Sequence, residues 1–503
     1  MPRRVAGNTG RQADVNSMSN ATASGIGGTT MLAGHRLVVP LLALVIAAVS
    51  AWFVLSYGYI EDDAYIHLEF ARSVAEGRGF SFNGHVVYGD TAPLWVFILI
   101  GIHTLGLGWI ASAKLACAAG ACLAISGAWK LGQELSSRNL SMLAVLVTLV
   151  NPYFVHWSFS GMETLAALGV SFWIVALGVL GIPSVPRLLG AALLMALAPL
   201  LRPEFLLLDA IVAPILLWRL WQHLGARPAV QRIAACAVFA ALMAAPVLLW
   251  SGYALATFGA IVPNTNLAKR GGGLRELIPR MMTVYGVGFP VTLALMAWLI
   301  PGLLRRRIPL AIAVLLLWPL ACVAFYLMNH TVVQTRYILV SMPSMSVALL
   351  WLAGQRYGRR PLMAIAGSMA LAGAIVIALI VVPHVCNKVE YAKLLTRVAS
   401  DIRENLPPQD RVAVFAIGQI EFESQHPLVD IGGITDRSVI PYMSSPGQTL
   451  QWARAHGARY FIAGERPEAG AEPVFAAMAP FIGWTFRHSQ YSTQQPLVIY
   501  RLP

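Results

Sequence analysis

The sequence is poor in charge. Only 12% of its 503 residues are Asp, Glu, Lys or Arg, whereas 57% are hydrophobic. Soluble domains carry about a quarter charged residues and about half apolar ones, so this composition excludes an ordinary soluble protein. It indicates instead a chain that crosses a membrane many times.

The sequence has few cysteines and no recognisable glycine-rich phosphate-binding loop. The five cysteines show no metal-binding spacing and lie mostly in apolar runs, so we interpret them as small buried side chains outside any disulfide framework. The stretches "GRGF" (77–80) and "KRGGGLRE" (269–276) lack the strand–loop–helix context that cradles nucleotide phosphates. No nucleotide cofactor is predicted.

Acidic residues are fewer than basic ones, and the net charge is +13. This balance does not predict a nucleic-acid partner, because Lys and Arg also anchor the cytoplasmic loops of membrane proteins. Residues 1–34 are rich in Gly, Ser, Thr and Asn, which predicts a disordered cytoplasmic tail.

Long apolar runs predict eleven transmembrane helices of roughly 15–23 residues, close to the ~20 needed to cross the hydrocarbon. A twelfth run, 91–108, is predicted to lie along the surface, with Trp95 at headgroup level. With the amino terminus inside, the cytoplasmic loops between Lys130 and Arg360 then hold twelve basic residues and only one acid, Glu134. The predicted spans lie near 37–57, 110–130, 139–156, 163–182, 187–201, 204–219, 232–251, 282–301, 308–328, 336–353 and 361–383.

The last 120 residues change character, with shorter apolar runs and more charge. We predict an all-α polytopic membrane domain over 35–384 and a small α/β domain outside the membrane over 385–503. Asp430 and Asp436 flank a Gly-Gly turn, which is typical of a loop. The predicted elements of this domain are helices over 389–406 and 449–457 and strands over 411–417, 427–433, 458–464 and 496–503.

This topology brings the polar clusters to the outer face, and the densest is Glu61, Asp62 and Asp63 at the end of the first span. A helix N-cap explains one acid, but not three in succession. The alternatives are a general base or a ligand for a divalent cation, at a boundary where low dielectric raises the pKa of a carboxylate. The other outer clusters are 160–164, 202–204, 262–270 and 334–336.

The stretch "DDAYIHLEFARSVAEGRGFSFNG" (62–84), followed by "GDTAPLW" (89–95), resembles the first outer loop of GT-C glycosyltransferases. It is most similar to the branch that includes the terminal β-arabinofuranosyltransferases of the cell envelope. That branch often has Glu-Gly-Tyr-Ser/Thr-Asn-Pro-Leu-Trp where this chain reads "VYGDTAPLW". More distantly the chain resembles lipid A aminoarabinose transferases and protein O-mannosyltransferases. Later motifs similar to those of the branch follow in the same order: "NPYFVHWSFSGMET", "LRPE", "VPNTNLAK" and "TRYILVSMPS".

The resemblance implies many transmembrane helices with surface-lying helices in the first outer loop. It implies a sugar donor linked to polyprenyl phosphate and an inverting transfer outside the cytoplasm, with Asp62 or Asp63 as the catalytic base. A pentose such as arabinofuranose is favoured over a hexose, and the acceptor is a glycan, a lipid or a protein. We therefore expect a multi-pass protein of the bacterial inner membrane, in contact with membrane lipids, whose C-terminal domain is periplasmic.

A lipid-phosphate donor places its phosphate at the interface, so the enzyme needs cations at headgroup depth. Each candidate also has a structural reading. Lys269 and Arg270 are also explained by ordinary headgroup contacts, and Arg336 by snorkelling at the start of a span. Arg202 and Glu204 are also explained as an internal ion pair.

Glu61 and several further polar residues are candidates for substrate contacts. Glu163 opens a span, where capping is an equal alternative, and Asn264 either binds a sugar hydroxyl or forms an Asx turn. His67 lies four residues after Asp63, on the same helical face, and is a candidate for orienting the substrate. Asp209 is an intramembrane acid, functional unless it pairs with Arg202.

The predicted mechanism is a direct displacement, in which Asp62 or Asp63 deprotonates the acceptor and Arg336 or Lys269 stabilises the leaving phosphate. A lipid or glycan transporter or flippase without transferase activity is the main alternative. It is disfavoured because no internal repeat is visible and the polar clusters gather at one face rather than midway through the membrane. An inactive scaffold whose outer domain binds a partner is a third reading.

Overall fold

The computed structural model describes residues 59–135, 138–271, 273–303, 308–464, 479–488 and 493–502. The predicted tail 1–34 and first span 37–57 lie outside these residues. Within the described part, five helices are long and apolar enough to cross a membrane, or six if one bent pair forms a single span. The chain is thus mostly helical, and the count of eleven spans stays a prediction.

The segment predicted to be the first outer loop, called by that name below, begins with α2 (Asp62–Ala75). The first turn of α2 carries two acids that complement the positive end of the helix dipole. A short hairpin follows, formed by β1 (Ser81–Phe82) and β2 (His85–Val86). Helix α3 (Pro93–His103) then begins at a proline, as many helices do. Its 11 residues reach about 16 Å, too short to cross about 30 Å of hydrocarbon.

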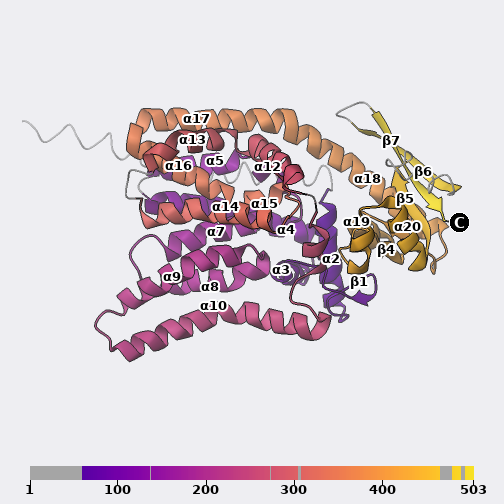
Figure 1. Ribbon diagram of the computed structural model, residues 1–503, viewed down its shortest axis with the longest axis horizontal. Coiled ribbons are helices and arrows are strands. Elements are labelled where there is room, and N and C mark those ends of the chain that lie inside the picture. Colours follow the sequence, from indigo (N-terminus) through magenta and orange to yellow (C-terminus); the bar gives the residue numbers. More distant parts are fainter. Residues whose placement is uncertain are drawn as a thin grey trace, which may run out of the picture. The chain divides into compact units, whose positions relative to one another are not determined.

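Most of the helices from α4 to α17 belong to runs predicted to span the membrane, and the longer ones lie side by side (Figure 1). Helix α10 exposes most of its length, including Leu248 and Leu249, as expected of a surface in contact with lipid. The helices are α4 (Trp109–Leu135), α5 (Arg138–Leu149), α6 (Pro152–Trp157), α7 (Thr164–Gly178), α8 (Val185–Leu201), α9 (Phe205–His223), α10 (Ala229–Phe258), α11 (Asn264–Ala268), α12 (Leu274–Gly288), α13 (Pro290–Leu303), α14 (Leu310–Met328), α15 (Thr335–Leu339), α16 (Met342–Tyr357) and α17 (Arg359–Val376).

Two predicted spans are interrupted. The run 282–301 is divided between α12 and α13, which meet at a bend of 100°. Pro290 begins α13, and a proline cannot continue the hydrogen-bond ladder of the preceding helix. The run 139–156 is interrupted before α6, where the Asn151 side chain accepts hydrogen bonds from two backbone N–H groups and caps the new helix.

Two predicted helical runs, 361–383 and 389–406, are joined. After α17 the chain makes a π-helical turn (Ile377–Val381) and continues directly into α18 (Val382–Asn405). Pro383 is tolerated because it lies in the first turn of α18, next to a stretch that already departs from the regular ladder. The expected domain boundary at 384/385 therefore falls inside a continuous helix.

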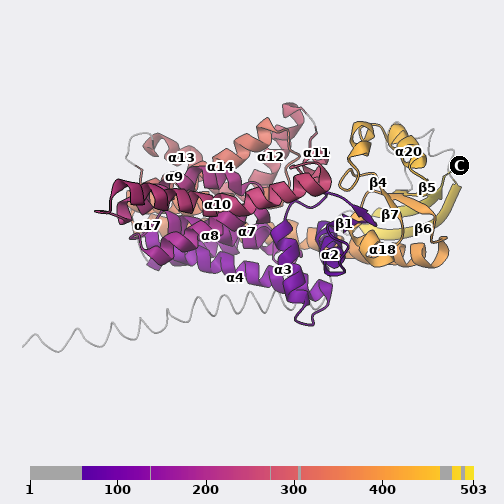
Figure 2. The same cartoon turned by 90° about the horizontal axis from the view of Figure 1, so that it is seen from below.

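The C-terminal domain contains a five-stranded sheet, which lies next to α18 (Figures 1 and 2). The strand order is β4-β3-β5-β7-β6, with β3 parallel to β4 and β5 and the other two pairings antiparallel. The four predicted strands are confirmed, whereas β6 was missed because Pro480 and Gly483 weaken its strand pattern. The elements are β3 (Arg411–Val414), α19 (Ile417–Ser424), β4 (Leu428–Asp430), a 3₁₀ turn (Arg437–Tyr442), α20 (Pro446–Ala455), β5 (Ala458–Gly464), β6 (Ala479–His488) and β7 (Thr493–Arg501).

Helices α4 and α7 approach closely because glycines lie at their contact. A Cβ atom placed on Gly169 would lie 2.7 Å from the backbone nitrogen of Ala124, and one on Gly120 would lie 2.7 Å from that of Ala166. Small residues of this kind allow membrane helices to pack backbone against backbone. Helix α7 is thereby held in place, and its first residues carry Glu163 toward the site described below.

We predict that Gly169→Val destabilises the chain by about 1–3 kcal/mol, because the added side chain would collide with α4. The measurement is the thermal unfolding midpoint in detergent. Gly252→Val is the matched control, since nothing lies within 4 Å of that position on α10. Equal midpoints for the two variants would contradict the close helix contact.

Candidate active site

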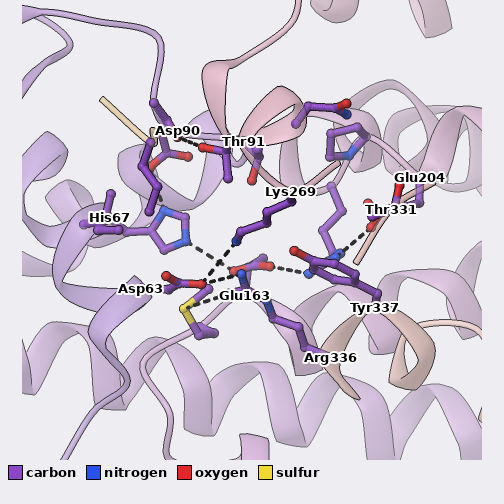
Figure 3. Close-up of a pocket in the computed structure, with 18 of the residues that line it drawn as sticks. Asp63, His67, Asp90, Thr91, Glu163, Glu204, Lys269, Thr331, Arg336 and Tyr337 are labelled. Carbon is purple, nitrogen blue, oxygen red and sulfur yellow. Dashed lines mark hydrogen bonds and ion pairs between the residues drawn. The ribbon is translucent and has the colours of Figure 1, made fainter. Parts of the chain in front are cut away.

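A cavity of about 390 Å³ opens where the first outer loop meets the ends of the membrane helices. Its charged side chains come from α2, from the start of α7, from the turn before α9 and from the segments around α11 and α15 (Figure 3). One residue of the C-terminal domain, Ile434, also lines it. The charged lining residues are Asp63, His67, Asp90, Glu163, Arg202, Glu204, Lys269 and Arg336.

Asp63 lies at the centre of this cluster. Its Oδ2 atom is 2.5 Å from Nη2 of Arg336 and 3.5 Å from Nζ of Lys269. The three residues come from α2, α15 and the end of α11, so only the folded chain brings them together. All three are site residues predicted from the sequence, and in the structure they line one cavity.

The electrostatics of Asp63 differ from the expectation. Burial would raise the pKa of its carboxyl group, but Lys269 and Arg336 hold the pKa well below its usual range. The prediction of a raised pKa is therefore wrong for Asp63, because two cations outweigh the low dielectric. The carboxylate is ionised and already neutralised by its partners.

Asp62 faces a different part of the molecule. Its carboxylate accepts hydrogen bonds from the backbone N–H groups of Gln419, at 2.8 Å, and Gly418, at 3.4 Å, in the first turn of α19. Burial raises the pKa of Asp62 to about 7, and the neighbouring charge of Asp63 adds to the rise. Asp62 thus binds the C-terminal domain, and it does not line the cavity.

Glu61 also lies outside the cavity. It is buried between Nε2 of His156, at 3.4 Å, and Nζ of Lys388, at 3.1 Å. Burial opposes ionisation, but these two partners lower the pKa of Glu61 to about 2. The three consecutive acids therefore have three different sets of partners, because successive residues of a helix start point in different directions.

His67 is held between two acids. Its Nδ1 atom lies 2.6 Å from Oδ2 of Asp90 and its Nε2 atom lies 3.5 Å from Oε2 of Glu163. Burial would lower the pKa of His67, but the two carboxylates raise it to about 10, so the ring is positively charged at neutral pH. Asp90 was not selected from the sequence, although it belongs to the quoted stretch "GDTAPLW".

Arg202 is buried between two further acids, with Nη1 2.6 Å from Oε1 of Glu163 and Nη2 2.7 Å from Oε1 of Glu204. The internal ion pair considered for Arg202 is therefore present. The alternative considered for Asp209, a pairing with Arg202, is not found: Arg202 pairs with Glu163 and Glu204, and the Oδ1 atom of Asp209 has no hydrogen-bond partner within the described part of the chain.

Two tyrosines complete this side of the cavity. The hydroxyl of Tyr326 donates to Oε1 of Glu204 at 2.9 Å. The ring of Tyr337 lies 5.2 Å from the guanidinium carbon of Arg202 and 5.3 Å from that of Arg336. Sequence reasoning missed both tyrosines, because an aromatic residue near a helix end is usually an interface anchor.

The lining charges compensate one another, with four acids and four cations. Lys269 is the most loosely held cation, since its Nζ atom is 3.5 Å from its carboxylate partner and its side chain is 19% exposed. The other three cations each have a partner within 2.7 Å. Lys269 is therefore the cation most available to an incoming anion.

Besides Glu61, two further predicted binding residues, Asn264 and Arg270, do not line the cavity. Asn264 begins α11, and its side-chain amide reaches the Thr435 carbonyl in the C-terminal domain at 3.5 Å. Arg270 is exposed, and its backbone pairs with Thr331. The cavity is lined instead by Thr265 and Asn266.

The described residues contain no group of three or more His, Cys, Asp and Glu side chains arranged to hold a metal ion. Asp62 and Asp63 contact different partners, and Asp63 is already matched by two cations. These two acids therefore do not fit the divalent-cation site considered from the sequence.

The C-terminal residues 387–500 match a family described as "Domain of unknown function (DUF8728)". No curated protein matched the chain.

Solved structures similar to the chain are membrane glycosyltransferases. ArnT from Cupriavidus metallidurans bound to undecaprenyl phosphate superposes with a TM-score of 0.58, at 13% identity over 92% of this chain and 98% of that chain. The apo state of the same protein superposes with a TM-score of 0.58, at 14% identity over 93% of this chain and 98% of that chain. The Archaeoglobus fulgidus oligosaccharyltransferase in complex with zinc and sulfate superposes with a TM-score of 0.50. The identity is 12%, over 92% of this chain and 73% of that chain. The chain has a GT-C membrane fold.

The raised pKa of Asp62 predicts a pH dependence of stability. Because the folded-state pKa of about 7 lies above the ordinary value of 3.8, the folded chain holds this proton more tightly than the unfolded chain. The resulting stabilisation is present at about pH 4 and is lost as the pH rises through about 7. The thermal unfolding midpoint of Asp62→Asn should therefore fall less than that of the wild type as the pH rises from about 4 to about 7.

The matched control is Glu404→Gln, an exposed acid on α18, whose midpoints should follow the wild type. An Asp62→Asn profile identical to the wild type would show that Asp62 is not buried against α19.

Proposed function

We propose that the chain is an integral-membrane glycosyltransferase that moves a sugar from a polyprenyl-phosphate donor to an acceptor hydroxyl. The transfer takes place on the outer face of the bacterial inner membrane, with the C-terminal domain in the periplasm. The observation that carries the proposal is the buried Asp63 carboxylate, held beside Lys269 and Arg336 in a cavity at the ends of apolar helices. The GT-C fold and the undecaprenyl phosphate bound by ArnT support it.

One end of the cavity suits the lipid part of the donor. Leu206 and Leu207 at the start of α9 and Phe325 on α14 line it, and Leu206 and Phe325 are 53% and 38% exposed. Apolar side chains thus continue from the cavity to the surface of helices that are suited to contact lipid. A polyprenyl chain can follow this surface while its phosphate reaches the charged cluster.

Lys269 is the proposed phosphate ligand. A phosphate adjacent to Lys269 gains a charge-assisted hydrogen bond and leaves Asp63 with Arg336 as its remaining cationic partner. Removing one of two cationic partners raises the pKa of a carboxylate. Donor binding would thus make Asp63 a stronger base in the complex than in the empty cavity.

In the proposed reaction, Asp63 accepts the proton of the acceptor hydroxyl as that oxygen attacks the anomeric carbon of the sugar. The new carbon–oxygen bond forms on the face opposite the phosphate, and the bond from the anomeric carbon to the phosphate oxygen breaks. Polyprenyl phosphate leaves with one more negative charge, which Lys269 stabilises. Arg336 keeps the Asp63 side chain in place. The sequence resemblance favours a pentose such as arabinofuranose, with a hexose as the alternative.

We predict that Asp63→Asn lowers sugar transfer by about 10²–10⁴-fold, because the amide cannot accept the proton. The measurement is the mass of the envelope glycan and of glycosylated proteins in cells that carry only the variant. Asp62→Asn is the control, since Asp62 lies outside the cavity, and it should retain transfer. Normal transfer by Asp63→Asn at normal membrane abundance would refute the proposed base.

We predict that Lys269→Ala weakens the binding of undecaprenyl phosphate by about tenfold, the loss of one charge-assisted contact. Binding is measured by the thermal shift of the purified chain across a titration with this lipid. Arg270→Ala is the matched control, because the adjacent residue is exposed and does not line the cavity. Equal weakening by both substitutions would indicate a general headgroup effect and contradict the assignment.

A further inference from the structure

The turn after β4 in the C-terminal domain has a fixed shape. The carboxylate of Asp430 is buried and accepts hydrogen bonds from the N–H of Gly432, at 2.7 Å, and from the N–H and hydroxyl of Thr435, at 2.6 and 3.0 Å. Gly433 has a φ of +71°, a conformation that favours glycine. Asp430 therefore shapes a turn that presents Ile434.

This turn packs against the residues that form the cavity. A Cβ atom on Gly89 would lie 3.0 Å from the carbonyl oxygen of Ile434, and one on Gly433 would lie 3.4 Å from Cβ of Ala268 in α11. The side chain amide of Asn264 reaches Thr435 at the other end of the turn. The C-terminal domain thus closes one side of the cavity with Ile434.

The neighbouring lining residues offer hydrogen-bonding groups. The hydroxyl of Thr265 donates to the carbonyl oxygen of Gly89, which ties α11 to the loop that carries Asp90 and Thr91. The Oδ1 atom of Asn266 is buried and has no hydrogen-bond partner in the described part of the chain. An unpaired buried oxygen is costly, and a hydroxyl group of a ligand would satisfy it.

Ile434 and Thr265 both contact Gly89, which directly precedes Asp90 and Thr91, and Asn266 follows Thr265 in α11. Figure 3 shows Asp90 and Thr91 on one side of Lys269, with Glu204 and Thr331 on the other. Leu206 and Leu207 lie two and three residues after Glu204, at the start of α9, and also line the cavity. An acceptor that must reach Asp63 opposite the leaving phosphate therefore has the first side available to it.

We infer that Gly89–Thr91, Thr265, Asn266 and Ile434 form the acceptor site, named here the acceptor wall. Asn266 Oδ1 accepts a hydrogen bond from a second hydroxyl of the acceptor, and Ile434 sets the width of the opening. The acceptor is accordingly a polyhydroxylated, sugar-like molecule, and the domain of unknown function contributes to the site. This inference rests on the proposed glycosyltransferase function.

The test compares Asn266→Ala and Ile434→Trp in the full-length chain, with Phe481→Ala as the control. Phe481 is an exposed apolar residue of β6 that does not line the cavity. Two quantities are measured for each variant: the thermal protection of the purified chain by undecaprenyl phosphate, and sugar transfer to the envelope glycan in cells that carry only that variant.

We expect Asn266→Ala and Ile434→Trp to lower transfer by about tenfold or more while protection by undecaprenyl phosphate stays within about twofold of the wild type. The reason is that one substitution removes an acceptor contact and the other narrows the opening, and neither touches the lipid end. Phe481→Ala should match the wild type in both measurements.

The inference is overturned if both variants transfer normally, or if they lose lipid protection together with transfer, which would assign the wall to the donor. If Ile434→Trp does not fold, Asn266→Ala alone tests the acceptor wall, because the alanine removes an amide without adding bulk. Asp63→Asn is measured alongside. If that variant transfers normally, the proposed function fails and the inference fails with it. If Asp63→Asn loses transfer while Asn266→Ala and Ile434→Trp transfer normally, the proposed function stands and only the assignment of the acceptor wall is overturned.

Discussion

The structure of the site depends on charge compensation in a place where water is scarce. Breaking a buried ion pair leaves an uncompensated charge and costs about 3–5 kcal/mol, so each of the lining charges requires its partners. Asp63 needs Arg336, and Arg202 needs Glu163. The first pair joins α2 to α15, the second joins the start of α7 to the turn between α8 and α9, and His67 links α2 to Glu163. Through these pairs the first outer loop is held to the ends of the membrane helices. The geometry of the cavity follows from these pairs as much as from apolar packing.

The same compensation bears on the chemistry. A carboxylate with two cations beside it is a weak base, and Lys269 and Arg336 lower the pKa of Asp63 in this way. Lys269 has the longest distance to its carboxylate partner of the four cations, 3.5 Å. An incoming phosphate therefore competes with Asp63 for Lys269 first. In the proposed mechanism, the negative charge of the donor phosphate draws Lys269 away from Asp63 and thereby raises the pKa of the base. Arg336, held within hydrogen-bonding distance, keeps the carboxylate oriented through this exchange.

The C-terminal domain is joined to the first outer loop at Asp62, next to the proposed base Asp63. The first turn of α19 binds Asp62, and a Cβ atom on Gly418 would overlap the Asp62 carbonyl group, which explains a glycine at this position. On the other side, the turn shaped by Asp430 reaches the cavity with Ile434. A domain with no catalytic spacing of its own can therefore influence the reaction, because it contacts the backbone on both sides of the site.

The sequence by itself determined the helical membrane class, four of the five strands of the terminal sheet and most of the charged residues of the cavity. These features follow from apolar run length, strand alternation and the placement of polar clusters at helix ends, which are local properties. It also placed Asp63 and His67 together, because they are one helical turn apart. Only the tertiary structure separated the roles of Asp62 and Asp63 and brought Asp90, Tyr337 and Ile434 to the site. Their partners are distant in sequence, and such pairings are set by how helices and domains pack against one another, which residue spacing does not encode.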